Sequence, residues 1–173
     1  MEGIVFAMGL LLVMTYLWIM SLFKKRQAVL DALGIIDSYV AKQTNLIDEL
    51  LALKIEVSMV SIIAITRRLK ADYKKLKQVE VTQHFVDMQT FEQLMQPILS
   101  KLENNRELTQ QAAVFQTIQS YQELAELIKG AYQFYNVAVS EFNTAVNVFP
   151  GVMIAYILRV NTMPLYPIKR HLS

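Results

Sequence analysis

The feature that most constrains this fold is an uncharged run of twenty residues near the N-terminus, Ile4–Phe23, "IVFAMGLLLVMTYLWIMSLF". At about 1.5 Å per residue, a helix of this length extends roughly 30 Å, the thickness of the hydrocarbon core of a bilayer. Lys24, Lys25 and Arg26 follow the run, whereas a cleavable signal peptide carries its positive charge before the apolar stretch. The run therefore predicts an uncleaved transmembrane anchor, in preference to a buried core helix.

The flanks of the run predict its orientation. Tyr16 and Trp18 lie toward its second end, where amphipathic rings favour the membrane interface. Glu2 precedes the run and three cations follow it, and positive residues flank the cytoplasmic end of a span. The prediction is a single-pass protein with its N-terminus outside and residues 24–173 in the cytoplasm. The anchor residues singled out are Ile4, Leu11, Tyr16, Trp18, Phe23, Lys24, Lys25 and Arg26.

The composition excludes several classes of function. The chain has 173 residues, enough for one domain with a core, and no cysteine, which excludes disulfides and thiolate chemistry. It carries 17 basic and 15 acidic residues, a balance too even for a protein that binds nucleic acid by neutralising phosphates. Nucleic acid is therefore not an expected partner.

Two helices are predicted between the anchor and residue 104. From Lys24 to about Gln78 there is no proline, and apolar residues recur in steps of three and four, which predicts one very long helix with a kink at Gly34. The apolar stretch 57–65 within it is bracketed too closely by charges to span a membrane, so it is expected to be core or interface. A second helix is expected from Val81 or Thr82 to Asn104, bent at Pro97.

A strongly basic stretch, "RRLKADYKKLK", occupies residues 67–77. On a helix its cations cover about half the circumference, which suits an anionic lipid surface or an acidic partner. The alternative is the solvated face of a bundle helix. The cationic residues are Arg67, Arg68, Lys70, Lys74, Lys75 and Lys77.

The best-defined helix of the sequence ends before Pro150-Gly151, a helix-terminating pair. Its apolar positions alternate by three and four residues over four heptads, which predicts a seam of an antiparallel bundle or coiled coil. The seam consists of Ile118, Tyr121, Ala125, Ile128, Tyr132, Tyr135, Val139, Phe142, Val146 and Phe149. The next apolar segment, 152–158, is too short to span a membrane and is expected to fold back on the bundle, followed by an extended tail with Pro164 and Pro167.

Two asparagines flank this seam one heptad apart, Asn136 after Tyr135 and Asn143 after Phe142. A polar residue beside a seam can fix its register and partner choice at some cost in stability. The alternative is that the asparagines, with Tyr132 and Tyr135, line a groove for a partner peptide.

No arrangement of residues in the sequence points to catalysis or metal binding. His84 and His171 have neither a carboxylate nor a second histidine at metal-ligand spacing, so a surface or locally hydrogen-bonded histidine is expected. The neighbours Asp48 and Glu49 point about 100° apart on a helix and do not converge. We expect no enzyme, no metal, no cofactor and no small-molecule substrate.

Three blocks of residues resemble the LemA family of small bacterial membrane-anchored proteins. The C-terminal block matches the family's repeated aromatic-Asn, Phe-Pro and Pro-aromatic pattern through Tyr135, Asn136, Val139, Phe142, Asn143, Phe149, Pro150, Ala155, Pro164 and Tyr166. The block after the anchor consists of Ile36, Asp37, Lys42, Asn45, Leu46 and Ile47. A third block consists of Phe115, Ile118 and Gln119. Asp48-Glu49 replaces the family's Pro-Asn, which is typical of a divergent member.

Asp37 and Lys42 are five residues apart, so each is expected to find a cross-helix partner or to remain a simple exposed charge.

The resemblance implies an all-α protein of the bacterial inner membrane, with an antiparallel bundle of about three long helices behind one transmembrane helix. The expected organisation is an anchor over 1–23, a bundle domain over 24–149 and a tail over 150–173. The family's members are associated with membrane proteostasis, envelope responses or the shaping of specialised bacterial membranes.

Three functional hypotheses follow. The leading one is a non-enzymatic, membrane-tethered scaffold whose cytoplasmic bundle binds a membrane protein, a larger complex or copies of itself. The second is direct work on the bilayer through residues 67–77 and 152–158. The third is a dedicated structural subunit of a large envelope complex, such as a secretion or motor machine.

Overall fold

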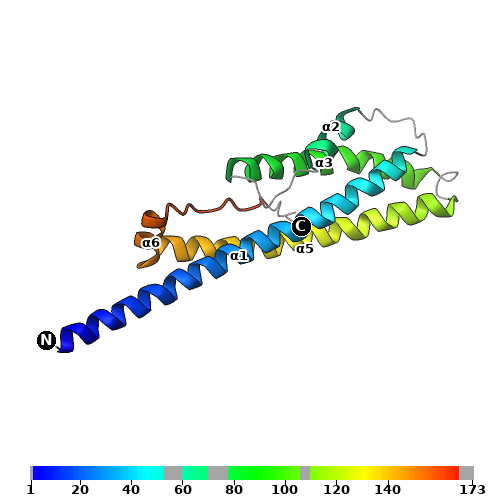
Figure 1. The fold of residues 1–173 in the computed structure, drawn as a ribbon. Coiled ribbons are helices and arrows are strands. Elements are labelled where there is room, and N and C mark those ends of the chain that lie inside the picture. The colour runs from blue at the N-terminus through cyan, green and yellow to red at the C-terminus, as the bar shows by residue number, and fades with distance from the viewer. Residues whose placement is uncertain (1, 53–59, 70–77, 106–109, 168–173) are drawn as a thin grey trace, which may run out of the picture.

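The computed structural model of the chain describes residues 2–52, 60–69, 78–105 and 110–167. These residues form five helices: α1 (Glu2–Ala52), α2 (Val60–Leu69), α3 (Gln78–Asn104), α5 (Ala112–Asn147) and α6 (Gly151–Leu158). The described ranges contain no strand. The predicted all-α fold, with a long apolar N-terminal helix leading into a bundle of three long helices, is confirmed (Figure 1).

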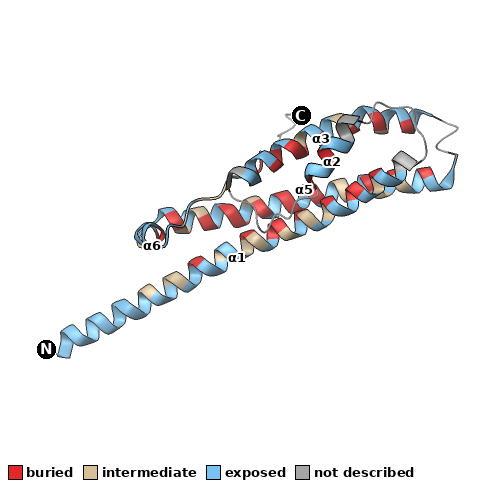
Figure 2. Cartoon of the chain, turned by 45° about the horizontal axis from the view of Figure 1, so that its top comes forward, coloured by how far each residue is buried: buried red, intermediate tan, exposed pale blue. Residues whose placement is uncertain are grey.

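Helix α1 is a single element of 51 residues, about 76 Å long, that belongs partly to the bundle and partly to its surroundings. Its N-terminal part projects beyond the other helices, and none of its most apolar 18-residue window is buried (Figure 2). From Leu22 onward one side of the same helix enters the core. The buried apolar residues of this side are Leu22, Val29, Ala32, Leu33, Ile36, Val40 and Ile47. The helix continues through Gly34 without a break.

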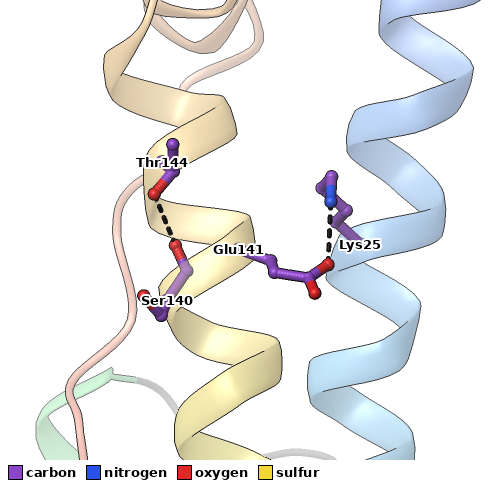
Figure 3. Close-up of polar contacts among 4 residues, drawn as sticks. All are labelled: Lys25, Ser140, Glu141 and Thr144. Atoms are coloured by element: carbon purple, nitrogen blue, oxygen red, sulfur yellow. Dashed lines mark hydrogen bonds and ion pairs between the residues drawn. The ribbon is translucent and has the colours of Figure 1, made fainter.

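Helices α1 and α5 pack against each other in opposite directions and form the main contact of the fold (Figure 1). Just beyond the anchor, the Lys25 Nζ donates to Glu141 Oε2 at 2.9 Å (Figure 3). One turn along α5, the Thr144 hydroxyl donates to the backbone carbonyl of Ser140 at 2.8 Å. The ion pair marks the register of the two helices, because it places Glu141 level with the cationic residues that follow the apolar run.

Helix α3 runs antiparallel to α5 (Figure 1), and α2 packs on α3. Near one end, the Gln122 Nε2 donates to Glu103 Oε1 at 2.6 Å, and near the other end Phe85 contacts Tyr132 and Tyr135. The expected start and end of this second helix, Val81 or Thr82 and Asn104, agree with the observed Gln78–Asn104.

The prediction of one helix from Lys24 to about Gln78 is wrong. The described part of this region forms two helices, and α2 packs mainly on α3 instead of extending α1 (Figure 1). The reason is an apolar side of α2, with Ile65 and Leu69 buried, that packs against α3. Residues 53–59 and 70–77 lie outside the described residues.

Helix α5 ends at Asn147, and α6 begins after Pro150 at an angle of 93° to it. The predicted stop at Pro150-Gly151 and the fold-back of the next segment agree with this corner, because α6 packs on both α5 and α1. The prediction that Phe149 closes the seam is wrong, since its side chain is 73% exposed. The helix ends two residues earlier, so Phe149 no longer follows the helical register.

By length and composition, α1 is the helix in the described part of the chain that qualifies as a membrane span. Helices α5 and α6 would qualify as a second only if they were counted together across their bend.

Candidate functional site

The tail after α6 is held against α5 by the two asparagines that flank the seam. The Asn143 side chain donates to the Met163 carbonyl and accepts from the Met163 N–H, both at 2.8 Å. The Asn136 side chain does the same with Tyr166, at 2.9 and 2.8 Å. An amide side chain carries a donor and an acceptor side by side. Each asparagine therefore satisfies both the N–H and the C=O of one tail residue, as a residue of a neighbouring β-strand would. We call this arrangement the asparagine clamp.

The spacing of the clamp follows from the dimensions of a helix and of an extended chain. The two asparagines are seven residues apart, which is about 10.5 Å along a helix. Their tail partners are three residues apart, which is about 10 Å along an extended backbone. A heptad on α5 therefore matches a three-residue step of the tail.

Two prolines favour an extended backbone at the two tail residues that the asparagines bind. Met163 precedes Pro164 and Tyr166 precedes Pro167, and a residue before proline is driven toward an extended backbone. The expectation of an extended tail agrees with residues 160–167, which contain no helix and run as an extended trace back from α6 (Figure 1), while residues 168–173 lie outside the described residues. The two residues that the asparagines bind are thus the two whose backbones the prolines hold extended.

The structure shows what contacts Asn136, Asn143, Tyr132 and Tyr135, for which the sequence left two hypotheses, control of the helix register and a groove for a partner peptide. These residues contact the tail of the same chain, in the place that the hypothesis gave to a partner peptide. The Tyr135 hydroxyl donates to the Pro164 carbonyl at 2.7 Å, between the two asparagine contacts. The Tyr132 ring stacks on Tyr166 with centroids 3.6 Å apart and planes 7° from parallel.

Phe85 of α3 completes the site and was missed by sequence reasoning. Its ring meets Tyr132, Tyr135 and Tyr166 edge-on, with centroids 5.8, 5.4 and 5.1 Å apart. Edge-to-face pairs of this kind add about 0.5–1.5 kcal/mol each beyond area burial. The available indication was the spacing of Val81, Phe85 and Met88, which continues the three- and four-residue steps of α3 upstream of Phe91.

A cavity of about 610 Å³ lies beside this aromatic cluster, between α1, α3, α5 and the tail. Five glutamines line it: Gln43, Gln89, Gln93, Gln96 and Gln122. Glutamine side chains can hydrogen-bond a ligand, but they do not titrate, so they cannot act as general acids or bases in this cavity. Of the charged lining residues, Lys129 Nζ lies 3.5 Å from Glu126 Oε2.

The tyrosines at this site stay neutral in the physiological range. Burial, and secondarily the negative charge of Glu92, raises the pKa of Tyr121 and of Tyr166 above the usual value. Burial likewise raises the pKa of Tyr132 and of Tyr135. The hydroxyls therefore act as hydrogen-bonding groups, as that of Tyr135 does toward the tail.

His84 is buried, so the expectation of a surface histidine is wrong; a locally hydrogen-bonded one remains the alternative. Its side chain is 4% exposed on α3, directly before Phe85. Burial lowers the pKa of His84 from its usual 6.5 to about 3. His171 lies outside the described residues.

The buried His84 predicts a fold that weakens in mild acid. Above pH 6.5 both folded and unfolded states hold a neutral imidazole; below it only the unfolded state takes up the proton. The free energy of unfolding should then fall by about 1.4 kcal/mol per pH unit, or roughly 2 kcal/mol by pH 5. His84→Leu should flatten this part of the pH profile in denaturant unfolding of the full chain in detergent. His171→Leu is the control, and an equal slope in both variants contradicts the prediction.

Most residues of the family pattern lie in the core or in the clamp. Ile36, Ile47, Tyr135, Val139, Phe142 and Tyr166 are buried, and Leu46 is half-buried. Pro150 stands at the start of α6.

Phe115 departs from the expected packing role, because its side chain is 50% exposed near the start of α5. Lys42 lies 5.8 Å from the centre of the Tyr39 ring on its own helix, so its contact is local. Asp37 is half-buried on α1.

Little of the basic stretch 67–77 falls within the structure. Arg67 and Arg68 end α2 and are exposed, and Arg68 Nη1 lies 3.6 Å from Asp87 Oδ1 of α3. Lys70, Lys74, Lys75 and Lys77 lie outside the described residues.

The anchor residues are placed as a projecting apolar helix requires. Ile4, Leu11, Tyr16 and Phe23 are exposed, Trp18 is half-buried where α6 meets α1, and Lys24 and Arg26 are exposed beyond them.

The Lys25–Glu141 pair should add little stability in spite of its position. The two side chains are 33% and 60% exposed, and exposed ion pairs contribute about 1 kcal/mol or less. Lys25→Ala should therefore lower the free energy of unfolding by no more than about 1 kcal/mol. A double-mutant cycle with Glu141→Ala measures the pair, with Lys24→Ala as the control. A coupling well above that value would mean that the pair is shielded from water.

Comparison with known proteins agrees with the residue pattern. The sequence model of the LemA family matches residues 23–172, which begins at the last residue of the apolar run and covers the bundle, the clamp and the tail. Neither a curated protein nor a solved structure matches the chain.

Proposed function

This chain belongs to the LemA family, and we propose that it is a non-enzymatic, membrane-anchored helical scaffold. Its bundle binds a membrane protein, a larger complex or copies of the same chain. The bundle stands in the cytoplasm of a bacterial cell, at the inner membrane, with the N-terminus on the other side.

One observation carries the proposal: the most apolar helix segment is continuous with the bundle, but most of it lies outside the core. The segment is uncharged from Ile4 to Phe23, none of its most apolar 18-residue window is buried, and it meets the core at its last turns through Trp18, Ile19 and Leu22. Exposing so much apolar surface to water is strongly unfavourable, while a bilayer accommodates it. The same α1 then supplies a buried stripe to the bundle, so the anchor and the bundle form one rigid unit.

The composition of the bundle supports a scaffold in preference to an enzyme. Among the described residues, no group of three or more His, Cys, Asp or Glu side chains is placed to hold a metal ion. Five of the sixteen residues that line the cavity beside the clamp are glutamines, and the Asn and Tyr side chains that the sequence singled out bind the chain's own tail. The contacts of these side chains are packing and hydrogen-bonding contacts within the chain.

The hypothesis of a dedicated subunit in an envelope complex is a narrower form of the same proposal. The hypothesis that residues 67–77 lie on lipid gains no support from their described part, because Arg68 lies close to Asp87 on α3.

Membrane anchoring is tested by charge insertion in the full chain. Leu11→Arg combined with Val13→Arg places two cations in the middle of the apolar run, each costing about 3 kcal/mol of insertion free energy. We expect the wild-type protein to stay with membranes in alkaline extraction and the variant to be released. The control is Phe115→Arg with Leu127→Arg, two exposed apolar residues of α5, which should leave the protein membrane-bound. A wild-type protein released by alkali refutes the anchor.

The scaffold role is tested by cross-linking in intact cells followed by purification in mild detergent. We expect the full chain to be recovered in complexes with a defined membrane protein or with itself. Recovery of monomer alone across growth conditions contradicts the scaffold while leaving the anchor intact.

A further inference from the structure

Helix α6 is apolar on its exposed side as well as on its buried side. Its sequence, "GVMIAYIL", contains no charged residue, and Gly151, Ile154 and Ala155 face the bundle. The remaining side chains and the two residues before the corner form an exposed apolar edge: Val148, Phe149, Val152, Met153, Tyr156, Ile157 and Leu158. Tyr156 is 87% and Ile157 73% exposed. A helix that is apolar all round is not a water-facing surface helix.

The apolar edge lies at the end of the bundle from which the anchor emerges (Figures 1 and 2). Gly151 approaches the Trp18 side chain so closely that an added Cβ would lie 3.0 Å from its Nε1. The Lys25–Glu141 contact agrees with this position, because Asn147 is six residues beyond Glu141 and α5 runs opposite to α1. The corner of α5 therefore reaches past the cationic cluster to the level of Trp18, about 7.5 Å inside the end of the apolar run.

The orientation of α6 matches the plane of a membrane. Helices α1 and α5 run antiparallel, and α6 turns by 93° from α5. When α1 stands along the bilayer normal, α6 therefore lies close to the bilayer plane. In-plane helices bury their apolar side about 5–10 Å into the boundary between headgroups and acyl chains, the depth at which α6 lies.

We propose that α6 is an interfacial membrane helix, with its apolar edge among the acyl chains of the leaflet in which the anchor ends. The inference rests on the proposed anchor, because that anchor fixes the height of the bilayer. Exposed cations adjoin both elements in sequence: Lys24 and Arg26 follow the apolar run of α1, and Arg159 caps the end of α6. The occupant of this surface is thus the anionic lipid around the anchor, continuous with the lipid that covers residues 4–17.

Two points of membrane contact constrain the bundle more than one does. A single helix can tilt and rotate in the bilayer, whereas a second element held beside it at a right angle resists both motions. The tail clamp contributes to this arrangement, because α6 is tied at one end to α5 and at the other to the clamped tail.

Site-specific probes in the full-length protein test the proposal. The chain has no cysteine, so a single introduced cysteine can carry a fluorophore. The probe positions are Ile157→Cys in α6, Leu11→Cys in the anchor and Gln116→Cys at the distal end of α5. The protein is reconstituted into vesicles of phosphatidylcholine and phosphatidylglycerol that contain lipids with a quencher on the acyl chain. We expect quenching at Ile157→Cys and Leu11→Cys to exceed that at Gln116→Cys by at least about threefold.

The outcomes separate this inference from the proposed function. Quenching at Leu11→Cys but only background quenching at Ile157→Cys overturns the interfacial helix and leaves the anchor standing. Background quenching at Leu11→Cys removes the anchor. Disulfide cross-linking between copies through Tyr156→Cys, with no lipid quenching at position 157, shows that a second chain covers the edge and also overturns the proposal.

A matched pair of charged variants adds a second measurement. Ile157→Asp should reduce lipid quenching of a probe at Tyr156→Cys to the level of Gln116→Cys. Leu127→Asp, which changes an exposed apolar residue on the side of α5, should leave that quenching unchanged. Equal quenching in both variants counts against burial of the apolar edge in lipid.

Discussion

Replacing both clamp asparagines, Asn136→Ala with Asn143→Ala, is expected to release the C-terminal tail from α5. Each asparagine makes two hydrogen bonds to one tail residue, at 2.8–2.9 Å. A hydrogen bond contributes about 0.5–1.5 kcal/mol, so each substitution should weaken tail docking by about 1–3 kcal/mol. The loss is larger for the pair, because Tyr166 then also leaves its contacts with Phe85 and Tyr132.

Amide hydrogen exchange reads this release directly. The Met163 and Tyr166 N–H groups donate to the asparagine side chains. Their exchange should accelerate by roughly ten- to hundredfold when the asparagine that binds them is removed. Asn147→Ala, at the exposed end of the same helix, is the control and should leave both amides protected. Asn143→Asp keeps the acceptor for the Met163 N–H but loses the donor, so its effect should be intermediate. Unchanged exchange in the double variant would mean that the tail is held by its other contacts, the hydrogen bonds from Tyr135 and Gln89 and the rings around Tyr166.

Gly151→Ala is expected to disrupt the corner between α5 and α6. A Cβ at this position would collide with the Ala145 carbonyl oxygen and would lie 3.0 Å from the carbonyl carbon and from Trp18 Nε1. Backbone atoms of a helix cannot move aside as a flexible side chain can. We therefore expect the free energy of unfolding to fall by at least about 2 kcal/mol.

Gly130→Ala is the matched control for this substitution. Gly130 lies in α5, the helix whose Ala145 carbonyl faces Gly151, and an added Cβ at Gly130 meets nothing within 4 Å. Alanine in place of an unconstrained helical glycine should raise stability by about 0.5–1 kcal/mol. The measurement is denaturant unfolding followed through Trp18, the single tryptophan, whose emission should shift in Gly151→Ala already before unfolding. Equal stability of the two alanine variants would refute the close packing at the corner.

The parts of the fold that repeat along the chain were predictable from sequence. The three- and four-residue steps of α5 placed Tyr132, Tyr135, Val139 and Phe142 in the core, where they lie. The Pro150-Gly151 pair predicted the corner. These features depend on local periodicity and backbone chemistry, both of which are present in a single sequence.

The parts that depend on contacts between distant residues were not predictable in the same way. The clamp joins positions 20 and 30 residues apart, and nothing near Asn136 or Asn143 indicates an extended partner. The separation of α2 from α1 was missed because both carry apolar helical patterns, and the partner of α2 is α3. Phe85 was overlooked because its three aromatic neighbours come from α5 and the tail.

The continuity of α1 has a mechanical consequence. From Lys24 to Ala52 the helix rises about 42 Å above the end of the apolar run without a hinge. A stiff helix of this kind transmits torque, so a rotation of its N-terminal apolar segment turns the end near Ala52 through a similar angle. Under the proposed anchoring, a membrane protein that contacts residues 4–23 is therefore mechanically connected to whatever binds the far end of the bundle.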